Sequence, residues 1–477
     1  MRNQYKKLPI ILLFILLIFT SCEKLLDKEP TDKLSLEDVF KDTQGAKTAL
    51  AGAYKSLLTI NVYNRNVMVY PDLMGGNIKY SKTANFILDD IYNLIQNQND
   101  CTMNDTYSDL YKQLNNVNNI IAYTPTAAGP EKDKNRMIAE AKCIRALIHF
   151  EILRIYARPF GYTPDASHVG IVINLKPQLF GDPAPVRSTV AQCYTAIKND
   201  INEAILLFDN SNVVFPNGYQ QNYFSKLNAK AFLSKIDLYS NNFSEAFQLA
   251  DEVIKEGTYK LLTNAQYVGS WAGRIPSSES IIELPVENDF SSSSLGSYYQ
   301  ISLTPDGMYA ATNDILNLYS STDIRGRNNM FIANTINSTV FYSTKKYEKG
   351  SINATPIKLL RLSEIYLIRA EAAAELNRYD VANNDLNIIR KRADSNATDL
   401  NLTVKSDLIN AVLLERRKEL AFEGNLFFDL VRRNQGINRN DCTSPNCSLA
   451  FSDYRLVMPL PAQTINANTA IKQNEGY

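Results

Sequence analysis

One pattern, present twice, constrains the fold of this chain more than any other: two apolar stripes separated by a short polar break. Within residues 358–433 the apolar residues recur at steps of three and four, as expected for one face of an α-helix. Asn377 and Arg378 break the pattern. The stripes are formed by Leu362, Tyr366, Ala370, Ala373 and Leu376, and then by Ala382, Leu386, Ile389 and Ala393. They predict an antiparallel helical hairpin.

The second copy of this pattern lies at residues 229–254, with its break at residues 240–242. When the copies are aligned on Phe243 and Tyr379, small residues coincide where two helices must approach closely. Such spacing is typical of divergent tetratricopeptide-like units. Because one hairpin cannot cover its own apolar face, units of this kind stack on neighbours.

Further helical periods supply these neighbours. They cover residues 107–123, 132–156 and 188–208. An earlier helix runs through Leu58 and begins at a cap provided by Thr43 or Asp42. Residues 159–185 are punctuated by Gly and Pro and predict a long connecting loop. The expected fold is all-α dominated, a tetratricopeptide-like scaffold of about four helical pairs.

Two segments lack a sustained helical period. Residues 61–105 are rich in Asn, Tyr and Gly, and we expect loops and short elements there. Residues 260–355 form a loop-rich insert with short apolar runs, such as residues 281–286, and a serine tract at residues 291–294. The runs predict short strands. Long irregular stretches between helices commonly carry function, so we expect an irregular ligand-binding part here.

The N-terminus resembles an export signal. Positive residues precede an apolar run at residues 8–19 that is too short to span a bilayer. The run ends in Phe19-Thr20-Ser21-Cys22, which resembles a bacterial lipobox. We expect residues 1–21 to be a lipoprotein signal peptide and Cys22 to be lipidated, giving a stable membrane anchor. The alternative is a simple secretory signal followed by a chance cysteine.

Charge and cysteine usage limit the remaining functions. The 50 basic and 50 acidic residues balance, so nothing directs the chain to nucleic acid. Cys442 and Cys447 could close a small loop as a disulfide in an oxidising compartment, or remain reduced. Cys143 and Cys193 lie within helical periods and are expected to be buried apolar residues. Cys101 lies in a polar loop, and we assign it no role.

Recognisable catalytic motifs are absent. The only histidines are His149, within an apolar helical run that predicts a packed side chain, and His168, which we expect to be solvated in the long loop. The sequence contains no HExxH, GxSxG, phosphate loop or paired CxxC motif. The carboxylate pair of a glycosidase remains open, because the fold and not the sequence sets its spacing.

Aromatic residues in the two irregular segments are the candidates for ligand contact. Exposed rings can pack on sugar rings while neighbouring Asn, Asp and Arg bind hydroxyl groups. The candidates are Tyr80, Tyr92, Trp271, Tyr298, Tyr299 and Tyr309. For each, the alternative is an aromatic side chain half-buried under a loop. We assign no metal ligands, although the Asp- and Asn-rich loops leave room for structural calcium.

A further helix begins at Asp407 and is expected to end near Gly424 in a left-handed cap. Within it, Glu415 pairs with Lys418 and Arg416 with Glu419 at three-residue spacing, as on a salt-bridged surface. Residues 415–424, followed by Phe428-Asp429-Leu430-Val431-Arg432, resemble the signature of the SusD/RagB family of Bacteroidetes lipoproteins. Similar positions occur along the whole mature chain, at residues 26–30, 50–54, 323–325, 360–364, 459–461 and 473–477.

This resemblance implies four tetratricopeptide-like pairs and an irregular ligand-binding part, divided into an N-terminal part at 22–225 and an interlocked C-terminal part at 226–477. It also implies a lipid-anchored protein on the outer-membrane surface that covers a SusC-like TonB-dependent transporter. Proteins of this family capture oligosaccharides, or in some members peptides, and pass them on without chemistry. A surface glycoside hydrolase is the less favoured alternative.

Overall fold

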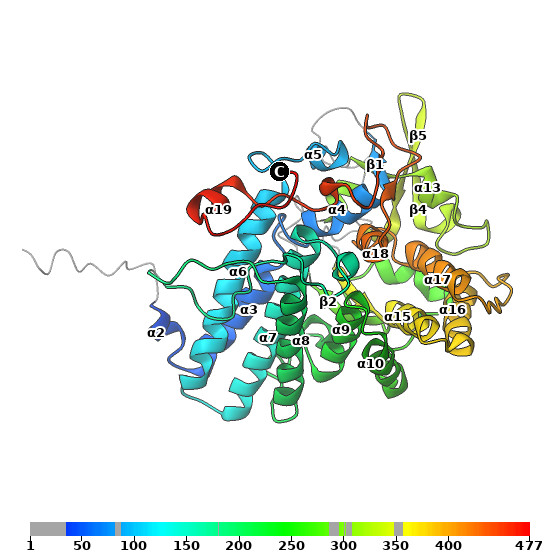
Figure 1. Ribbon diagram of the computed structural model, residues 1–477. Helices are drawn as coiled ribbons and strands as arrows, with labels where there is room; N and C mark the ends of the chain where they lie inside the picture. Colours follow the sequence, from blue (N-terminus) through cyan, green and yellow to red (C-terminus); the bar gives the residue numbers. More distant parts are fainter. Residues whose placement is uncertain are drawn as a thin grey trace, which may run out of the picture.

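The computed structural model describes residues 35–81, 87–179, 181–285, 295–299, 301, 308–347 and 356–477. Its helices lie side by side in a curved row (Figure 1). The helices of the row are α6 (Met103–Tyr123), α7 (Glu131–Tyr156), α8 (Val190–Phe208), α9 (Lys226–Tyr239), α10 (Phe243–Glu256), α15 (Leu362–Glu375), α16 (Tyr379–Ala393) and α17 (Lys405–Glu419). The predicted helix-dominated scaffold is confirmed.

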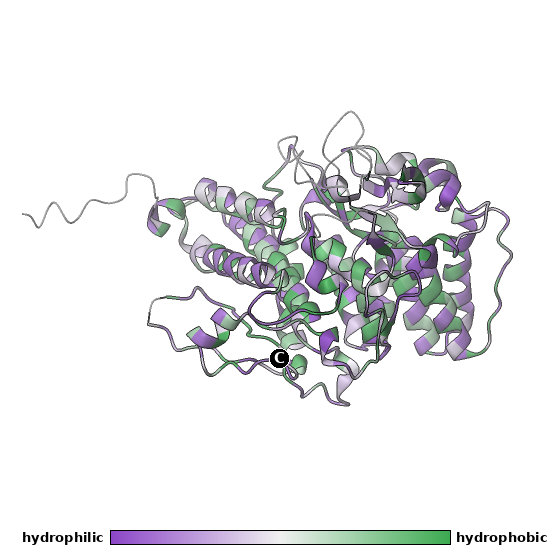
Figure 2. Cartoon of the chain, turned by 90° about the horizontal axis from the view of Figure 1, so that it is seen from above, coloured by the Kyte–Doolittle hydropathy of each residue, from purple (hydrophilic) through white to green (hydrophobic). Residues whose placement is uncertain are grey.

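The two hairpins that the repeated pattern predicts are α9–α10 and α15–α16, and α10 packs against α15. The row of helices therefore continues although the insert separates them in sequence. Each hairpin turns through an asparagine with positive φ, Asn241 at 56° and Asn377 at 59°. Asparagine tolerates this left-handed conformation better than most residues. Hydrophobic residues line the sides of the helices that face one another, and polar residues cover the outer sides (Figure 2).

Shorter helices connect and cover the row. They are α2 (Leu36–Val39), α3 (Thr43–Ser56), α4 (Asn66–Gly75), α5 (Asp89–Tyr92), α11 (Asn264–Tyr267), α12 (Leu295–Tyr299), α13 (Asn313–Leu316), α14 (Arg327–Met330), α18 (Leu426–Arg432) and α19 (Ala462–Ala467). Single 3-10 turns are η1 (Thr124–Thr126), η2 (Phe160–Tyr162), η3 (Gln220–Asn222), η4 (Gly269–Trp271), η6 (Lys345–Tyr347) and η7 (Tyr454–Leu456). The expected cap of α3 is confirmed, because the Asp42 side chain accepts a hydrogen bond from Gly45 N.

The strands form two-stranded antiparallel pairs, as expected for an irregular part with short strands. Strand β1 (Ile78–Tyr80) pairs with β3 (Tyr309–Ala311), and β2 (Ser280–Leu284) pairs with β6 (Ile357–Arg361). The hairpin of β4 (Phe331–Ile336) and β5 (Thr339–Thr344) lies within the insert. The C-terminal region adds β7 (Ile437–Asn438) and β8 (Ser448–Leu449). The pairs β4–β5 and β7–β8 each join neighbouring segments of the chain without another element between them, whereas β1–β3 and β2–β6 join segments that are far apart in sequence.

Helix α4 corrects the expectation that residues 61–105 contain only loops and short elements. All ten of its residues are buried. A helix buried on every side has no polar face, so its sequence carries no amphipathic period. The helix ends at Gly76, whose φ of 88° lies in the left-handed region that glycine adopts at little cost.

The end of α17 is also corrected. The helix stops at Glu419, five residues before the predicted Gly424 cap. In the turn that follows, Phe422 and Gly424 both have positive φ, at 67° and 72°. The buried Asp72 carboxylate accepts hydrogen bonds from the backbone N–H groups of both residues, each at 3.2 Å, and from the Asn77 amide at 2.7 Å. Asp72 therefore holds this turn against α4.

Burial raises the pKa of Asp72 to about 6, although these hydrogen bonds oppose the shift.

The prediction of a packed His149 is confirmed, since the side chain is fully buried and its Nε2 accepts from Asn174 N at 3.2 Å. Burial lowers the pKa of His149 to about 3. The expectation of a solvated His168 is wrong, because its ring nitrogens contact Thr163 Oγ1 at 2.8 Å and Arg158 O at 3.2 Å.

The cysteine expectations can be compared with the structure. Cys143 and Cys193 are fully buried, as predicted, and Cys101 is buried as well. Cys442 and Cys447 form a disulfide. The predicted signal peptide, Cys22 and the serine tract at 291–294 lie outside the described residues. Within the described part of the chain, no helix combines the length and the apolar character that crossing a membrane requires.

Candidate functional site

The two irregular segments that carry the sequence candidates meet in the structure. Strand β1 comes from the first segment and β3 from the second, and their register places Tyr80 opposite Tyr309. The pairing extends by one bond, from Ser81 N to Met308 O at 2.8 Å. Close by, Leu295 N at the start of α12 donates to the Asn64 side chain at 3.1 Å. Both segments therefore contribute to one region of the structure.

Five of the six candidate side chains belong to one series of ring contacts, which we call the aromatic spine. Centroid separations range from 4.7 Å for Tyr80–Tyr92 to 6.4 Å for the contact at Trp271. In spatial order the spine consists of Tyr92, Tyr80, Tyr309, Tyr299, Tyr347 and Trp271. Tyr347 was absent from the sequence candidates, although it lies in the same insert.

The spine is internal, so the expectation of exposed rings is wrong. All six candidate side chains are between 0% and 8% exposed. The hydroxyl groups of Tyr80 and Tyr309 both donate to Ile87 O, at 2.8 and 2.7 Å, and burial raises the pKa of both. Irregular chain has no regular apolar face, and here stacked rings provide its core. Ligand contact by these residues stays a prediction.

Tyr298, the sixth candidate, lies outside the spine and is covered by a cation. The Arg65 guanidinium lies 5.6 Å from the centre of its ring and is itself half-buried. Arg65 Nε donates to Asn66 Oδ1 at 2.8 Å, which fixes the guanidinium above the ring. Arg65 was not among the sequence candidates. Its position in a segment without helical period was the available signal.

At its other end the spine reaches buried cations. Trp271 lies beneath Lys346, Lys358 and Arg361, whose charged groups are 4.8, 5.1 and 5.3 Å from its ring. Cations attract the face of an indole ring more strongly than the faces of the other aromatic side chains. Trp271 therefore links the spine to the charged cluster described next, and it is not available for stacking on a ligand.

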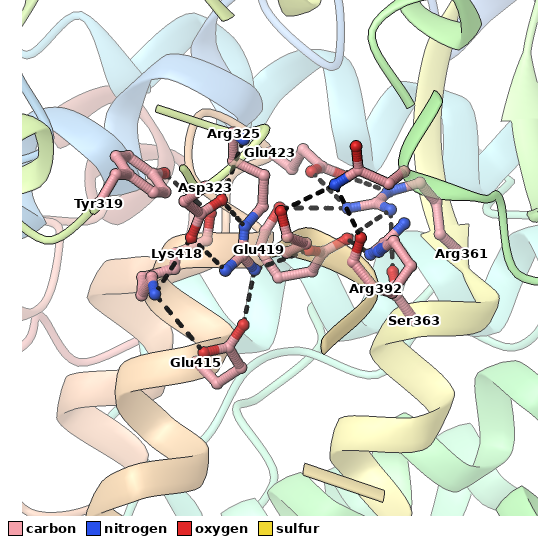
Figure 3. A network of polar contacts seen from close by, with 12 residues as sticks. Tyr319, Asp323, Arg325, Arg361, Ser363, Arg392, Glu415, Lys418, Glu419 and Glu423 are labelled. Atoms are coloured by element: carbon pink, nitrogen blue, oxygen red, sulfur yellow. Dashed lines mark hydrogen bonds and ion pairs between the residues drawn. The ribbon is translucent and has the colours of Figure 1, made fainter. Parts of the chain in front are cut away.

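This charged cluster, the Glu419 network, contains the family-like signature at the end of α17 (Figure 3). Glu419 accepts hydrogen bonds from Arg325 at 2.9 Å, Arg361 at 3.0 Å and Arg392 at 2.5 Å. Burial alone would raise the pKa of Glu419, but the three guanidinium groups outweigh it and hold that pKa well below its usual value. The carboxylate therefore stays charged.

The Glu419 network corrects the expected salt-bridged helix surface. Glu415 and Lys418 do approach within 3.8 Å, but Glu415 also accepts from Arg325 at 2.6 Å in the interior. Arg416, expected to pair with Glu419, instead binds Asp429 at 3.0 Å. These charges lie inside the protein because their partners come from other elements, which residue spacing within a helix cannot reveal.

A C-terminal loop closed by the Cys442–Cys447 disulfide holds the site from outside. Asp441 binds Lys79 of β1 at 2.6 Å and accepts from Asn313 N at 2.7 Å, so it joins β1 to the residues that follow β3. Thr443 N donates to the Tyr92 hydroxyl at 3.0 Å. We call residues 437–449 the C-terminal clamp. Its residues were missed as site residues, and the pair of cysteines was their only signal.

The chemistry of this region favours binding over reaction. The hydroxyl groups of Tyr80, Tyr92, Tyr309 and Tyr347 are hydrogen-bonded to neighbours, that of Tyr299 is buried without a partner among the described residues, and the Glu419 carboxylate is held in the charged form. Across the part of the chain that the structure describes, no cluster of three or more His, Cys, Asp or Glu side chains is suited to hold a metal ion. The accessible polar groups lie at the border, where Arg65, Lys79 and Asp441 reach the surface.

Comparison with known proteins gives consistent matches along the chain. The family model described as "Starch-binding associating with outer membrane" matches residues 24–238, and the model described as "SusD family" matches residues 287–477. The SusD-like protein P38 of Formosa agariphila is 24% identical over 532 residues, covering 100% of both chains. The SusD-like protein P25 of the same organism is 21% identical, covering 99% of this chain and 100% of its own.

Solved structures match the fold over the same extent. A SusD superfamily protein from Bacteroides vulgatus is 25% identical with a TM-score of 0.82, covering 92% of this chain and 100% of that chain. A SusD superfamily protein from Bacteroides thetaiotaomicron is 24% identical with a TM-score of 0.81, covering 91% and 99%. The row of helical pairs is thus shared with these proteins.

Proposed function

The chain belongs to the SusD/RagB family, and on that premise we propose that it is a surface lipoprotein that binds glycans and delivers them to a SusC-like TonB-dependent transporter. The observation that carries this proposal is the succession of two family models, one of them named for starch binding and outer-membrane association, along residues 24–238 and 287–477. The lipobox-like sequence ending at Cys22 supports an anchored position. The proposed activity is capture without catalysis.

The site supports this proposal because a rigid, buried set of side chains underlies polar groups at the surface. Sugar hydroxyl groups require fixed polar partners, and a rigid support lowers the entropy lost on binding. The spine and the Glu419 network provide such a support below the surface, while Arg65, Lys79 and Asp441 lie at its edge. We therefore place the main ligand surface over the Arg65–Tyr298 pair rather than on the spine tyrosines themselves.

A calorimetric titration tests the function. The mature chain from Glu23 onward is titrated with soluble starch, laminarin, xylan, alginate and a mixture of peptides, and each recovered ligand is checked for cleavage. We expect heat from a glycan that is recovered intact. Heat from peptides alone would favour the peptide-binding alternative, and a cleaved glycan would favour a hydrolase. Trp271 fluorescence is a poor readout, because this only tryptophan is 3% exposed.

Two further measurements test the anchor and the partner. Cells that express the full chain are fed a clickable fatty acid, and the Cys22→Ser variant should lose the lipid label while the unchanged chain keeps it. After mild detergent extraction, an affinity tag on the chain should recover a TonB-dependent transporter. Recovery of the chain without any outer-membrane transporter would contradict the delivery step and leave glycan binding standing.

A further inference from the structure

We infer that a second carbohydrate contact lies in the α3 pocket, a cavity of about 420 Å³ between the outer face of α3, the turn η3 and Pro285. Its volume falls within the range of small-molecule sites, roughly 300–1,000 Å³. It shares no lining residue with the spine, the Arg65–Tyr298 pair or the C-terminal clamp. This inference rests on the proposed function, because it assigns the pocket a sugar as occupant.

Helix α3 leaves the pocket open with small side chains. Ala51 and Gly52 line the cavity and are exposed, and a Cβ atom added to Gly52 would meet no atom within 4 Å. A glycine inside a helix costs about 1 kcal/mol relative to alanine. Neither a close neighbour nor a positive φ requires glycine at this position. What the glycine provides is space beside the helix backbone.

The opposite wall carries a fixed aromatic ring. Tyr223 stacks on Phe215 with centroids 4.5 Å apart and planes at 14°, and it meets Tyr54 edge to face at 5.3 Å. Tyr54 is held in turn, because its hydroxyl donates to Glu140 at 2.7 Å and accepts from Phe224 N at 2.8 Å. Tyr223 is half-buried and lines the pocket. Such a preorganised ring suits the apolar face of a pyranose.

Asn222 is the side chain of the pocket that could hydrogen-bond a hydroxyl group of a ligand. It lines the pocket and is 9% exposed, and its Oδ1 atom has no hydrogen-bond partner in the described structure. A buried amide with an unmet hydrogen bond costs about 1–3 kcal/mol. A ligand hydroxyl group can satisfy either end of the amide, whichever way it is turned. Because this oxygen is itself enclosed, a sugar hydroxyl group completes the unmet hydrogen bond only when the Asn222 side chain turns toward the cavity.

The charge of the pocket narrows the ligand class. Thr48 contributes a hydroxyl group, and the described lining residues include no Asp or Glu. An aromatic ring, an amide and a hydroxyl group suit neutral sugars. The pocket is thus assigned to one or two units of a neutral glycan.

The test fills the pocket from the side of the helix. Gly52→Leu places a bulky side chain in open space and raises helix propensity, so the variant should unfold at or above the temperature of the unchanged protein. Gln44→Leu, on an exposed position of the same helix away from the pocket, is the matched control. Affinity electrophoresis in gels that contain soluble starch, laminarin, xylan or alginate measures retardation of each mature chain.

We expect Gly52→Leu to weaken binding of the retarding glycan at least tenfold, and Gln44→Leu to leave it unchanged. A folded Gly52→Leu chain with full affinity overturns this inference while the proposed function stands. If the unchanged protein is retarded by none of these glycans in the gels and gives no heat with any in the calorimeter, both fail together.

Asn222→Ala provides a second readout that a purely structural role would not give. Removal of an unpaired buried amide should leave the unfolding temperature unchanged or higher, because no hydrogen bond to Oδ1 is lost. The same change should weaken glycan binding about tenfold. A variant that is less stable and binds normally would assign Asn222 to the fold and would overturn its role in the pocket.

Discussion

The hairpin α15–α16 and the Glu419 network lie close in sequence, yet their interiors are of opposite kinds. The hairpin and α17 enclose an apolar cluster that includes Ala370, Leu386 and Val412, and beside it Arg369 binds Asp385 through two hydrogen bonds. The Glu419 network instead buries carboxylates and guanidinium groups. Its central carboxylate, that of Glu419, depends on three of these guanidinium groups. Apolar packing is tolerant of partial change, whereas a buried charge without its partner is severely penalised. The comparison shows that packing of periodic apolar residues stabilises the helical scaffold. Specific charged partners stabilise the junction, by which we mean the Glu419 network and the turn after α17 that Asp72 binds.

The strongest test removes the shared charge of the junction. Glu419→Gln keeps the shape of the side chain but leaves Arg325, Arg361 and Arg392 with one buried carboxylate fewer. Loss of one partner from a buried ion pair costs about 3–5 kcal/mol, and we expect a decrease of that size in the free energy of unfolding. Urea denaturation of the mature chain measures it.

The matched control is Asp399→Asn, which removes a carboxylate from the surface pair Lys391–Asp399. Both of these side chains are about half exposed, at 48% and 53%, so their pair contributes less than about 1 kcal/mol. If Glu419→Gln destabilised the protein no more than this control does, the junction would not depend on its buried charges.

The apolar side of the comparison is tested by Leu386→Ala. Leu386 is fully buried in the hairpin cluster, and its truncation leaves a cavity. We expect a loss of about 2–5 kcal/mol in the free energy of unfolding, measured by the same urea titration. Leu206→Ala is the control, since Leu206 of α8 is 72% exposed and its loss should change stability by less than about 0.5 kcal/mol. Equal effects at the two positions would refute the packing of the hairpin.

A third test separates two carboxylates of the junction by pH. The pKa of Asp72 is raised to about 6 in the folded protein from 3.8, so the unfolded chain releases this proton first as the pH rises. Stability contributed by the protonated Asp72 is therefore lost as the pH rises from about 4 to 6, and a shift of this size corresponds to about 3 kcal/mol. Glu419, with a lowered pKa, acts in the opposite sense and loses its contribution as the pH falls below 4.5.

The measurement compares the unfolding free energies of the unchanged protein and Asp72→Asn between pH 4 and 7. The variant lacks the titrating group, so the advantage of the unchanged protein over it should shrink toward pH 6. Asp399→Asn serves again as the control and should run parallel to the unchanged protein. Parallel curves for Asp72→Asn would show that this carboxyl group is not titrating in the buried turn.

The smallest expected effect concerns the C-terminal clamp. A disulfide that closes so short a loop stabilises by about 2 kcal/mol in the chain-entropy description. The double variant Cys442→Ser/Cys447→Ser should lose about that amount, and hydrogen exchange should increase at Thr443, whose N–H group donates to the Tyr92 hydroxyl. Dithiothreitol should reproduce the loss in the unchanged protein and have no effect on the double variant. Sensitivity of the variant to dithiothreitol would assign the effect to another thiol.

The limits of prediction from sequence follow from the same comparison. The hairpins were predicted because a one-sided apolar face leaves a period in the residues, and even their Asn241 and Asn377 turns fell at the expected breaks. Helix α4 was missed because burial on every side removes that period. The ion pairs of α17 were misassigned because Glu419 selects Arg325, 94 positions earlier, over its helical neighbour Arg416. Local periodicity predicts which residues form a helix, but it does not show which distant residue will pair with a given charged side chain.

The candidate site followed the same rule. The two irregular segments meet through the pairing of β1 with β3, which no pattern in their sequences predicted. The exposure of their aromatic residues was not predictable, because Tyr309 is covered in part by Tyr80 and Tyr299 by Phe422, which come from distant parts of the chain. Arg65 and Asp441, at the border of this region, belong to no sequence motif. They could be recognised as site residues only from their contacts in the structure.

The pairing of β1 with the distant strand β3 affects the order in which parts of the molecule can fold. The hairpin α9–α10 can close as soon as residues 226–256 exist, because the contacts between its two helices are local. Strand β1 must wait for β3, and Lys79 must wait for Asp441, which lies 362 positions later in the chain. Long-range contacts of this kind close slowly and late. A growing chain therefore closes its first hairpin well before it has a closed binding region, and a chain cut short before residue 437 would never acquire one.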